Sequence, residues 1–183
     1  MLSVWLLVSM MKAEAANLCP GIDVPVDKFT GKAAQSAGVT VVSDGFAVPW
    51  IFELVDGRLT LTVRVSAVGI RDEVFLAGYA LPVMLKDGSI VTLVTKEATY
   101  PVAATAATVV TNWPLVFRLD KALAAQLAAQ PITDMRIVTP ERTMSFPVKT
   151  AYAKLLTTVL GCFGQYVEEA PIHSEPAGEG SVD

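Results

Sequence analysis

Carboxylates are the residues with which this chain is best equipped to do chemistry. Asp72 and Glu73 are adjacent, and Asp44 and Glu141 fall at predicted turns. Two carboxylates from distant loops can share general acid and base roles, as in glycoside hydrolysis. Charged residues are also common at solvated turns, and that role is the alternative for each of the four. The sequence therefore leaves a carboxylate-dependent hydrolase open but assigns no catalytic residue.

Other catalytic chemistries lack the residues that they need. The one histidine, His173, lies near the C-terminus, so the body of the chain has no imidazole for a Ser-His or Cys-His base. The sequence contains no G-x-S-x-G elbow, no G-x-G-x-x-G segment and no P-loop, the motifs of acyl transfer and nucleotide binding. It has no Cys/His cluster with zinc spacing either. We expect neither a cofactor nor a metal.

Two aromatic residues beside prolines are candidates for contact with a partner. Tyr100 precedes Pro101 and Trp113 precedes Pro114, which places both in predicted loops. Aromatic rings in such places stack on sugars or on protein surfaces, and packing in the core or at its rim is the alternative for each. We therefore take Trp113 and Tyr100 as possible partner-contact residues. Trp50 belongs to the apolar face of a predicted strand and is assigned to the core.

The N-terminus predicts export. Residues 2–11 form an apolar run, and Ala13-Glu14-Ala15 follows it; this layout is typical of a secretory signal peptide with an A-x-A cleavage site. Cleavage after Ala15 gives a mature chain that begins at Ala16. A membrane anchor is one alternative, but ten residues cover only about half of a bilayer core; a buried helix is another. We expect a periplasmic or secreted protein with no membrane span after cleavage.

The cysteine content agrees with export. Cys19 and Cys162 are the only two cysteines, and an even pair in an exported chain predicts a disulfide bond. That bond would join the two ends of the domain and stabilise it by up to about 5 kcal/mol through the entropy of the unfolded chain. Two unpaired thiols are the alternative.

Composition predicts one domain with an acidic tail. The chain has 183 residues and a net charge of −4, and after loss of the signal peptide it fits one domain over residues 16–166. Residues 167–183 carry five acidic and no basic residues, in a Pro/Gly-rich segment that we expect to be disordered. The body then carries 13 basic and 12 acidic residues. No basic stripe is evident, so nucleic-acid binding is disfavoured.

Two Asp-Gly dipeptides predict hairpins. The first, at residues 56–57, favours a two-residue type I′ turn between residues 50–55 and 58–65. Its apolar residues then share one face, in the pairs Leu54–Leu59, Phe52–Leu61, Trp50–Val63 and Val48–Val65. The second, at residues 87–88, would pair Leu85 with Ile90 and Leu81 with Val94. Both faces of that hairpin are apolar, which predicts strands covered on two sides, although Pro82 argues for a strand end or edge.

The rest of the chain predicts helices that follow the strands. Residues 115–119 alternate as a strand, Asp120 is placed to cap a short helix, and Pro131 ends that helix. Residues 132–138 and 143–148 predict another hairpin, and apolar residues from Tyr152 to Phe163, including Leu155, mark one face of a closing helix. This order indicates the α+β class: an antiparallel meander followed by a helix, a β-hairpin and a C-terminal helix packed on the sheet.

Residues 27–31, DKFTG, resemble the D-x-F-T-G opening of small exported bacterial proteins of unknown function. The similarity extends over residues 22–163 and includes an Asp-Gly hairpin in an apolar sheet and a Leu-rich helix. It also includes a hairpin with an Arg-Ile step, here Arg136-Ile137, and a closing helix that ends in a cysteine, here Cys162. The resemblance implies an envelope or secreted location. It implies no activity, cofactor or functional residue.

Two classes of function remain. The first is a non-catalytic exported module that binds a protein or glycan of the cell envelope through its loops or an exposed sheet edge. The second is a small secreted hydrolase that uses carboxylates. A cleft that holds two facing carboxylates would favour the hydrolase, and a surface without such a cleft would favour binding.

Overall fold

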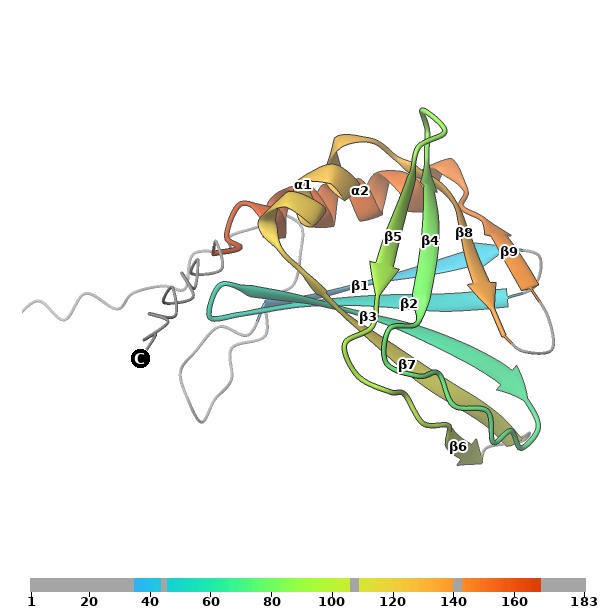
Figure 1. Cartoon of the computed structure of the whole chain (residues 1–183). Helices are drawn as coiled ribbons and strands as arrows, with labels where there is room; N and C mark the ends of the chain where they lie inside the picture. The colour runs from blue at the N-terminus through green and yellow to red at the C-terminus, as the bar shows by residue number, and fades with distance from the viewer. Residues whose placement is uncertain (1–34, 44–45, 106–108, 140–142, 169–183) are drawn as a thin grey trace, which may run out of the picture.

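Two antiparallel sheets and two helices form the part of the chain that the structure, a computed structural model, describes: residues 35–43, 46–105, 109–139 and 143–168. One sheet has five strands and the other has four. Figure 1 shows the four-stranded sheet standing against the five-stranded one, with both helices together on one side. The predicted α+β class is confirmed, with the strands of the meander divided between two sheets.

The five-stranded sheet has the strand order β1-β2-β3-β7-β6. Its strands are β1 (Gln35–Ser43), β2 (Phe46–Val55), β3 (Arg58–Val68), β7 (Val109–Leu119) and β6 (Val102–Thr105). Along β3 and β7 every second side chain is buried over most of the strand, because successive residues of a strand point to opposite faces. The sheet therefore has one face in the core and one face toward solvent.

The β2–β3 hairpin has the predicted register. The confirmed pairs are Trp50–Val63, Phe52–Leu61 and Leu54–Leu59. Asp56 and Gly57 have φ angles of 46° and 71°, and a type I′ turn requires positive φ at both positions. All the paired residues are buried. A slip of one residue would turn them all to solvent, so the hydrophobic pattern fixes this register.

The four-stranded sheet has the strand order β5-β4-β8-β9. Its strands are β4 (Ala80–Leu85), β5 (Ile90–Val94), β8 (Ile132–Val138) and β9 (Thr143–Pro147). The predicted β8–β9 hairpin is confirmed, with Val138 opposite Thr143. The ladder between β4 and β8 spans Val83 to Leu85. Pro82 lies beyond its end, so the missing N–H of the proline breaks no bond to β8.

The β4–β5 hairpin differs from its predicted register by one residue. Met84, rather than Leu85, lies opposite Ile90. Leu85 bonds across the loop to Ser89, with 2.8 Å between its N and the Ser89 O, so the loop encloses three residues instead of two. Gly88 is the one of these three with positive φ (85°). This fits a type I turn followed by a bulge, not the two-residue type I′ turn that the Asp-Gly dipeptide suggested.

The expectation that both faces of this hairpin are covered is wrong. Met84 is 37% exposed, Ile90 65% and Val94 50%, whereas the residues between them face the core. The strand β5 is also at the edge of its sheet. The sheet therefore presents an apolar outer surface to solvent, which the sequence did not distinguish from a second buried face.

Residues 95–99 connect the two sheets. Thr95 forms an antiparallel bridge with Phe117 of β7, and Thr99 forms one with Phe75. The N–H of Thr95 also donates to the carbonyl oxygen of Tyr79 at 3.0 Å. The segment therefore runs between residues 75–79 on one side and β7 on the other.

The first helix, α1 (Lys121–Ala129), begins and ends as predicted. The Asp120 carboxylate accepts the N–H of Leu123 at 2.8 Å, which satisfies one of the donors left open in the first helical turn. The helix stops before Pro131. It packs against the second helix and touches β7.

The second helix, α2 (Thr150–Gly164), closes the side of the molecule between the two sheets, because it contacts β1 of one sheet and β8 of the other. Its buried residues are Ala153, Leu156, Val159, Leu160 and Phe163. Leu155, which the periodicity placed on this face, is 53% exposed. The buried faces of α2 and of both sheets form one continuous core.

The chain after α2 packs back onto the five-stranded sheet. Val167 is 5% exposed, and the N–H of Glu168 donates to the carbonyl oxygen of Gly57 at 2.9 Å. Within the described ranges, no helix is long and apolar enough to cross a membrane. The predicted signal peptide, residues 1–15, and residues 169–183 of the predicted tail lie outside those ranges.

Candidate functional site

An open groove lies on the outer face of the five-stranded sheet. Its volume is about 340 Å³, within the range of about 300–1,000 Å³ that is usual for small-ligand sites. It is lined by residues of β3, β7 and the segment that crosses between the sheets: Thr60, Lys96, Glu97, Ala98, Thr99, Tyr100, Pro114, Val116 and Arg118. Tyr100, a partner-contact candidate from the sequence, is one of them.

Two interactions hold residues 96–100 beside β7. The bridge between Thr95 and Phe117 fixes the segment before it enters the groove. Near the other end, the Thr99 hydroxyl donates to the carbonyl oxygen of Pro114 at 3.2 Å. The groove is therefore built by residues far apart in the sequence, whose approach depends on the packing of the two sheets.

Pro114 lines the groove without breaking the sheet. The N–H of Gly69 donates to Val109 across the ladder between β3 and β7, and bonded pairs alternate along an antiparallel ladder. Pro114, opposite Arg64, then falls in a pair that exchanges no backbone bonds. Its nitrogen and carbonyl point away from β3, which agrees with the bond from Thr99. A proline is thus tolerated inside a long strand.

Exposed cations outnumber acids on this face of the sheet. The exposed cations are Arg58, Arg64, Lys96 and Arg118, and the exposed acids of the same surface are Glu53 and Glu97. None of the four cations forms an ion pair with a residue that the structure describes. The surface around the groove therefore carries positive charge, which attracts anions.

The two aromatic candidates have different positions. Tyr100 is 67% exposed, so its ring is open to contact. Trp113 does not lie in a loop, because it is part of β7 and is only 4% exposed. Its Nε1 donates to the carbonyl oxygen of Glu73 at 2.8 Å, and its ring meets Phe75 edge to face with 5.9 Å between centroids. Trp113 is therefore a core residue, like Trp50, and is not retained as a partner contact.

A second, much smaller cavity lies beside Trp113, between β3 and the β8–β9 hairpin. Its volume is about 30 Å³, roughly the share of one molecule in liquid water. Glu73 borders it, and the Oε2 atom of Glu73 is buried without a hydrogen-bond partner in the described part of the chain. Buried polar atoms are normally satisfied by protein or by ordered water. This cavity fits a water molecule and is too small for an organic ligand.

The carboxylates considered for catalysis are not brought together around either cavity. Asp72 lines neither of them, and the groove holds one acidic residue, Glu97. Asp44 and Glu141 lie outside the described residues. Neither the groove nor the small cavity therefore contains the two facing carboxylates that the hydrolase alternative requires.

The structure does not test the predicted disulfide bond between Cys19 and Cys162. Cys162 lies half-buried on α2, against the core, and Cys19 is outside the described residues, as is His173. Among the residues that the structure describes, no group of three or more His, Cys, Asp or Glu side chains is placed to hold a metal ion.

Most of the groove was not identified from the sequence. Alternation along β3 and β7 could have placed Thr60, Val116 and Arg118 outward, but no local pattern shows that Lys96 lies beside them.

Comparison with protein-family models, with curated proteins and with solved structures finds no match to this chain. The groove combines apolar, hydroxyl, aromatic and cationic groups on one surface, and this mixture is typical of binding sites.

Proposed function

We propose that this protein is an exported, non-catalytic module that binds a component of the cell envelope through the groove beside β7. The observation that supports the proposal is the groove itself, with its volume of about 340 Å³ and an exposed tyrosine in its lining. Small-ligand sites join an apolar lining to a few polar groups that fix orientation. Here Pro114 and Val116 supply the apolar lining, and Lys96 and Arg118 supply the polar groups.

Binding has more support than hydrolysis. Inverting and retaining glycosidases both place two carboxyl groups across the bond that is broken. The groove offers Glu97 alone, and its other ionisable side chains are cations and a tyrosine. Cations and an open tyrosine suit recognition of a ligand that stays unchanged.

Chemical-shift mapping tests the proposed contact surface. Isotope-labelled protein is titrated with a soluble extract of the native cell envelope, and we expect the largest shifts in residues 96–100, Thr60 and Arg118. Tyr100→Ala should remove most of these shifts. Leu155→Ala, at a residue of similar exposure on α2, should leave them intact. Shifts confined to another surface, or shifts that persist in Tyr100→Ala, would exclude the groove as the contact site.

The location and the disulfide are part of the same proposal and need their own test. Mass spectrometry of protein from native cells should show a chain that begins at Ala16. Alkylation before reduction should modify neither Cys19 nor Cys162, because an oxidising compartment favours the bond. Recovery of a chain that retains Met1 and takes up alkylating reagent at both cysteines would contradict export.

A further inference from the structure

We infer that the ligand of the groove is an acidic saccharide, whose carboxylate is held by Lys96 and Arg118 and whose sugar ring stacks on Tyr100. The inference rests on the proposed function and names the ligand class of the same groove. Three properties of the lining carry it: its charge, its mixture of apolar and hydroxyl groups, and the state of its backbone.

Charge favours an anionic ligand. Lys96 and Arg118 both line the groove, and neither is paired with an acid among the described residues. A guanidinium group can hold a carboxylate through two parallel hydrogen bonds. Arg58 and Arg64 extend the positive surface along the same face of β3. Glu97 opposes only part of this charge, so a carboxylate on the ligand would supply the missing counter-charge.

The uncharged part of the lining fits a sugar ring. Tyr100 offers an open aromatic face with a polar tip, and Pro114 and Val116 add apolar surface to the same groove. Thr60 lines it as well, and its hydroxyl group can exchange hydrogen bonds with ligand hydroxyls. A sugar ring has an apolar face of C–H groups and a rim of hydroxyls, so it matches both kinds of surface.

The backbone around the groove disfavours a peptide as the ligand. Thr95 donates to Tyr79, and Thr99 and Phe75 exchange two backbone bonds of 2.7 and 3.0 Å. On the other side of the groove, the edge of β7 that faces away from β3 includes Pro114, which has no N–H and whose carbonyl oxygen already accepts the Thr99 hydroxyl. Addition of a peptide strand needs an unpaired edge, and the backbone here is engaged. Recognition therefore falls to side chains, which favours a saccharide over an acidic peptide.

The spacing of Lys96 and Tyr100 limits the reach that a ligand needs in order to touch both residues. Lys96 and Tyr100 are separated by four peptide units, which span at most about 13 Å even in an extended chain. A disaccharide can place an acid near Lys96 and a second ring on Tyr100.

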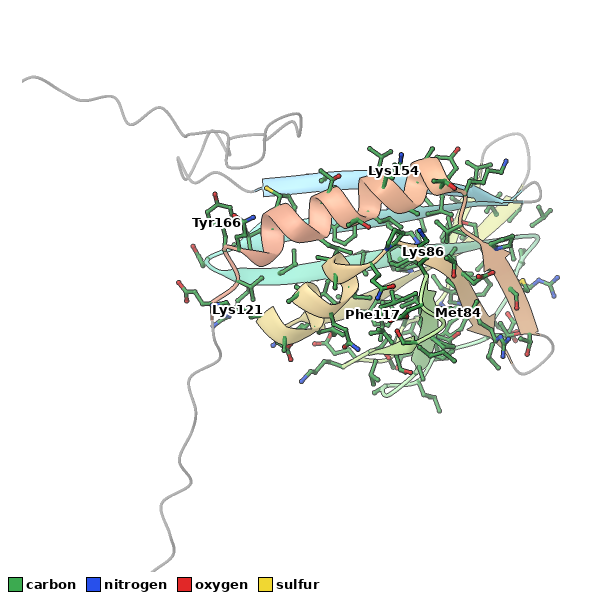
Figure 2. The ribbon with its side chains drawn as sticks, turned by 90° about the horizontal axis from the view of Figure 1, so that it is seen from above. Met84, Lys86, Phe117, Lys121, Lys154 and Tyr166 are labelled. Atoms are coloured by element: carbon green, nitrogen blue, oxygen red, sulfur yellow. The ribbon has the colours of Figure 1, made fainter. Side chains whose placement is uncertain are left out.

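Calorimetric titration of the purified chain with digalacturonate tests the inference. The comparison probes are its neutral methyl ester, which lacks the charge, and a hexaglutamate peptide, which carries more negative charge but no sugar ring. We expect digalacturonate to bind about tenfold more tightly than either, and binding should weaken as salt rises. Replacing both cations, K96Q with R118Q, should reduce its affinity about tenfold, and Tyr100→Ala should also reduce it. Lys154→Gln, at an exposed lysine on α2 (Figure 2), should leave it unchanged.

The outcomes separate this inference from the proposed function. Equal binding of the ester and the acid would overturn the need for a carboxylate, and preference for hexaglutamate would overturn the saccharide. Failure of all three probes to bind would overturn the inference as well. In each of these cases, shifts of the groove residues with the envelope extract would still support the proposed function. Loss of those shifts would remove the proposed function itself.

Discussion

Trp113 shows how a single buried residue holds a connecting loop in place. Its indole N–H reaches the carbonyl oxygen of Glu73 at 2.8 Å, and its ring packs against Phe75. Both partners belong to the connection between β3 and β4. Trp113→Ala removes the bond and leaves a cavity, so we expect the free energy of unfolding to fall by about 3–5 kcal/mol. Urea unfolding followed by circular dichroism measures the change.

Tyr100→Ala is the matched control for that substitution. The Tyr100 ring is 67% exposed, so its removal should change the unfolding free energy by no more than about 0.5 kcal/mol. Trp113→Phe keeps an aromatic ring and removes the indole N–H, so it separates the hydrogen bond from the packing. Leaving the carbonyl of Glu73 unpaired should lower the unfolding free energy by about 1 kcal/mol or more. Similar losses for Trp113→Ala and Tyr100→Ala would show that the two aromatic residues do not have the different roles assigned to them.

The hydrogen bonds of Asp87 predict how its pKa and the stability of the protein depend on pH. The Ser89 hydroxyl donates to Asp87 Oδ1 at 2.6 Å, the Ser89 N–H donates to the same oxygen at 2.9 Å, and Gln130 donates to Oδ2 at 2.8 Å. The two bonds from Ser89 hold the pKa of Asp87 below its ordinary value, with a smaller contribution from Gln130. Ser89→Ala should raise this pKa, and Gln130→Ala should raise it less. Titration of the Asp87 carboxyl carbon by NMR gives both values.

The sign of the effect on stability follows from the direction of that shift. A carboxyl whose pKa is lower in the folded state favours folding when it is charged. Its contribution is therefore present above the ordinary carboxyl pKa and is lost as the pH falls through the folded value. The difference in unfolding free energy between the parent chain and Ser89→Ala should be largest near neutral pH and should shrink in acid. A difference that grows in acid would contradict this assignment.

At the scale of elements, the two Asp-Gly hairpins show what local sequence determines and what it does not. At residues 56–57 the dipeptide is the whole loop, both φ angles are positive, and the register follows from the sequence. At residues 87–88 the dipeptide is part of a three-residue loop that Ser89 closes by bonding to Leu85 and Asp87. Both loop lengths accept Asp-Gly. The three-residue loop places Ile90 on the outer face of the sheet, where its side chain is 65% exposed.

The cap of α1 is an element whose stability can be tested directly. Asp120 accepts the Leu123 N–H at 2.8 Å, and the first turn of this helix has no acidic residue to assist it. Asp120→Ala should lower the unfolding free energy by about 1 kcal/mol. Asp120→Asn keeps an oxygen acceptor and should lower the unfolding free energy by less. Thermal unfolding of the two variants ranks them, and equal losses would mean that the capping bond contributes nothing.

Two strands and one wall of the groove were missed because their partners are distant in sequence. No sequence pattern predicted β1 or β6, and β6 has four residues, too few for a clear periodic pattern. Because Pro114 follows Trp113, the sequence predicted a loop at Trp113. The strand continues through this proline because its nitrogen points away from β3 and breaks no bond of the ladder. The pairing of Thr95 with Phe117 and the bond from Thr99 to Pro114 place residues 96–100 beside β7, and neither contact is visible in the local sequence.

At the scale of the whole molecule, the second helix joins parts of the chain that the sheets leave separate. It contacts β1, β8 and α1, and its buried side chains continue the core of both sheets. The groove lies on the opposite, solvent-facing side of the five-stranded sheet. Changes on the exposed side of α2 should therefore leave the groove intact, which is why Lys154 and Leu155 serve as control positions.

The residues that follow α2 are expected to stabilise the whole domain. Val167 is 5% exposed, and Glu168 bonds to the turn of the β2–β3 hairpin through the oxygen of Gly57. Truncation after Gly164 removes this apolar contact and this bond, so it should lower the unfolding free energy by about 2 kcal/mol or more. Urea unfolding of the truncated chain measures the loss.

Truncation after Glu168 is the matched comparison. It keeps Val167 and the bond to Gly57 and removes only residues 169–183, a segment whose acidic Pro/Gly-rich composition predicts no share in the core. The unfolding free energy should then stay within about 0.5 kcal/mol of the full chain. If both truncations destabilise the protein equally, the stabilising contacts lie beyond Glu168. If neither does, the burial of Val167 contributes little. We expect a clear difference between the two, because the buried side chain of Val167 lies three residues past the end of α2 and only the shorter truncation product lacks it.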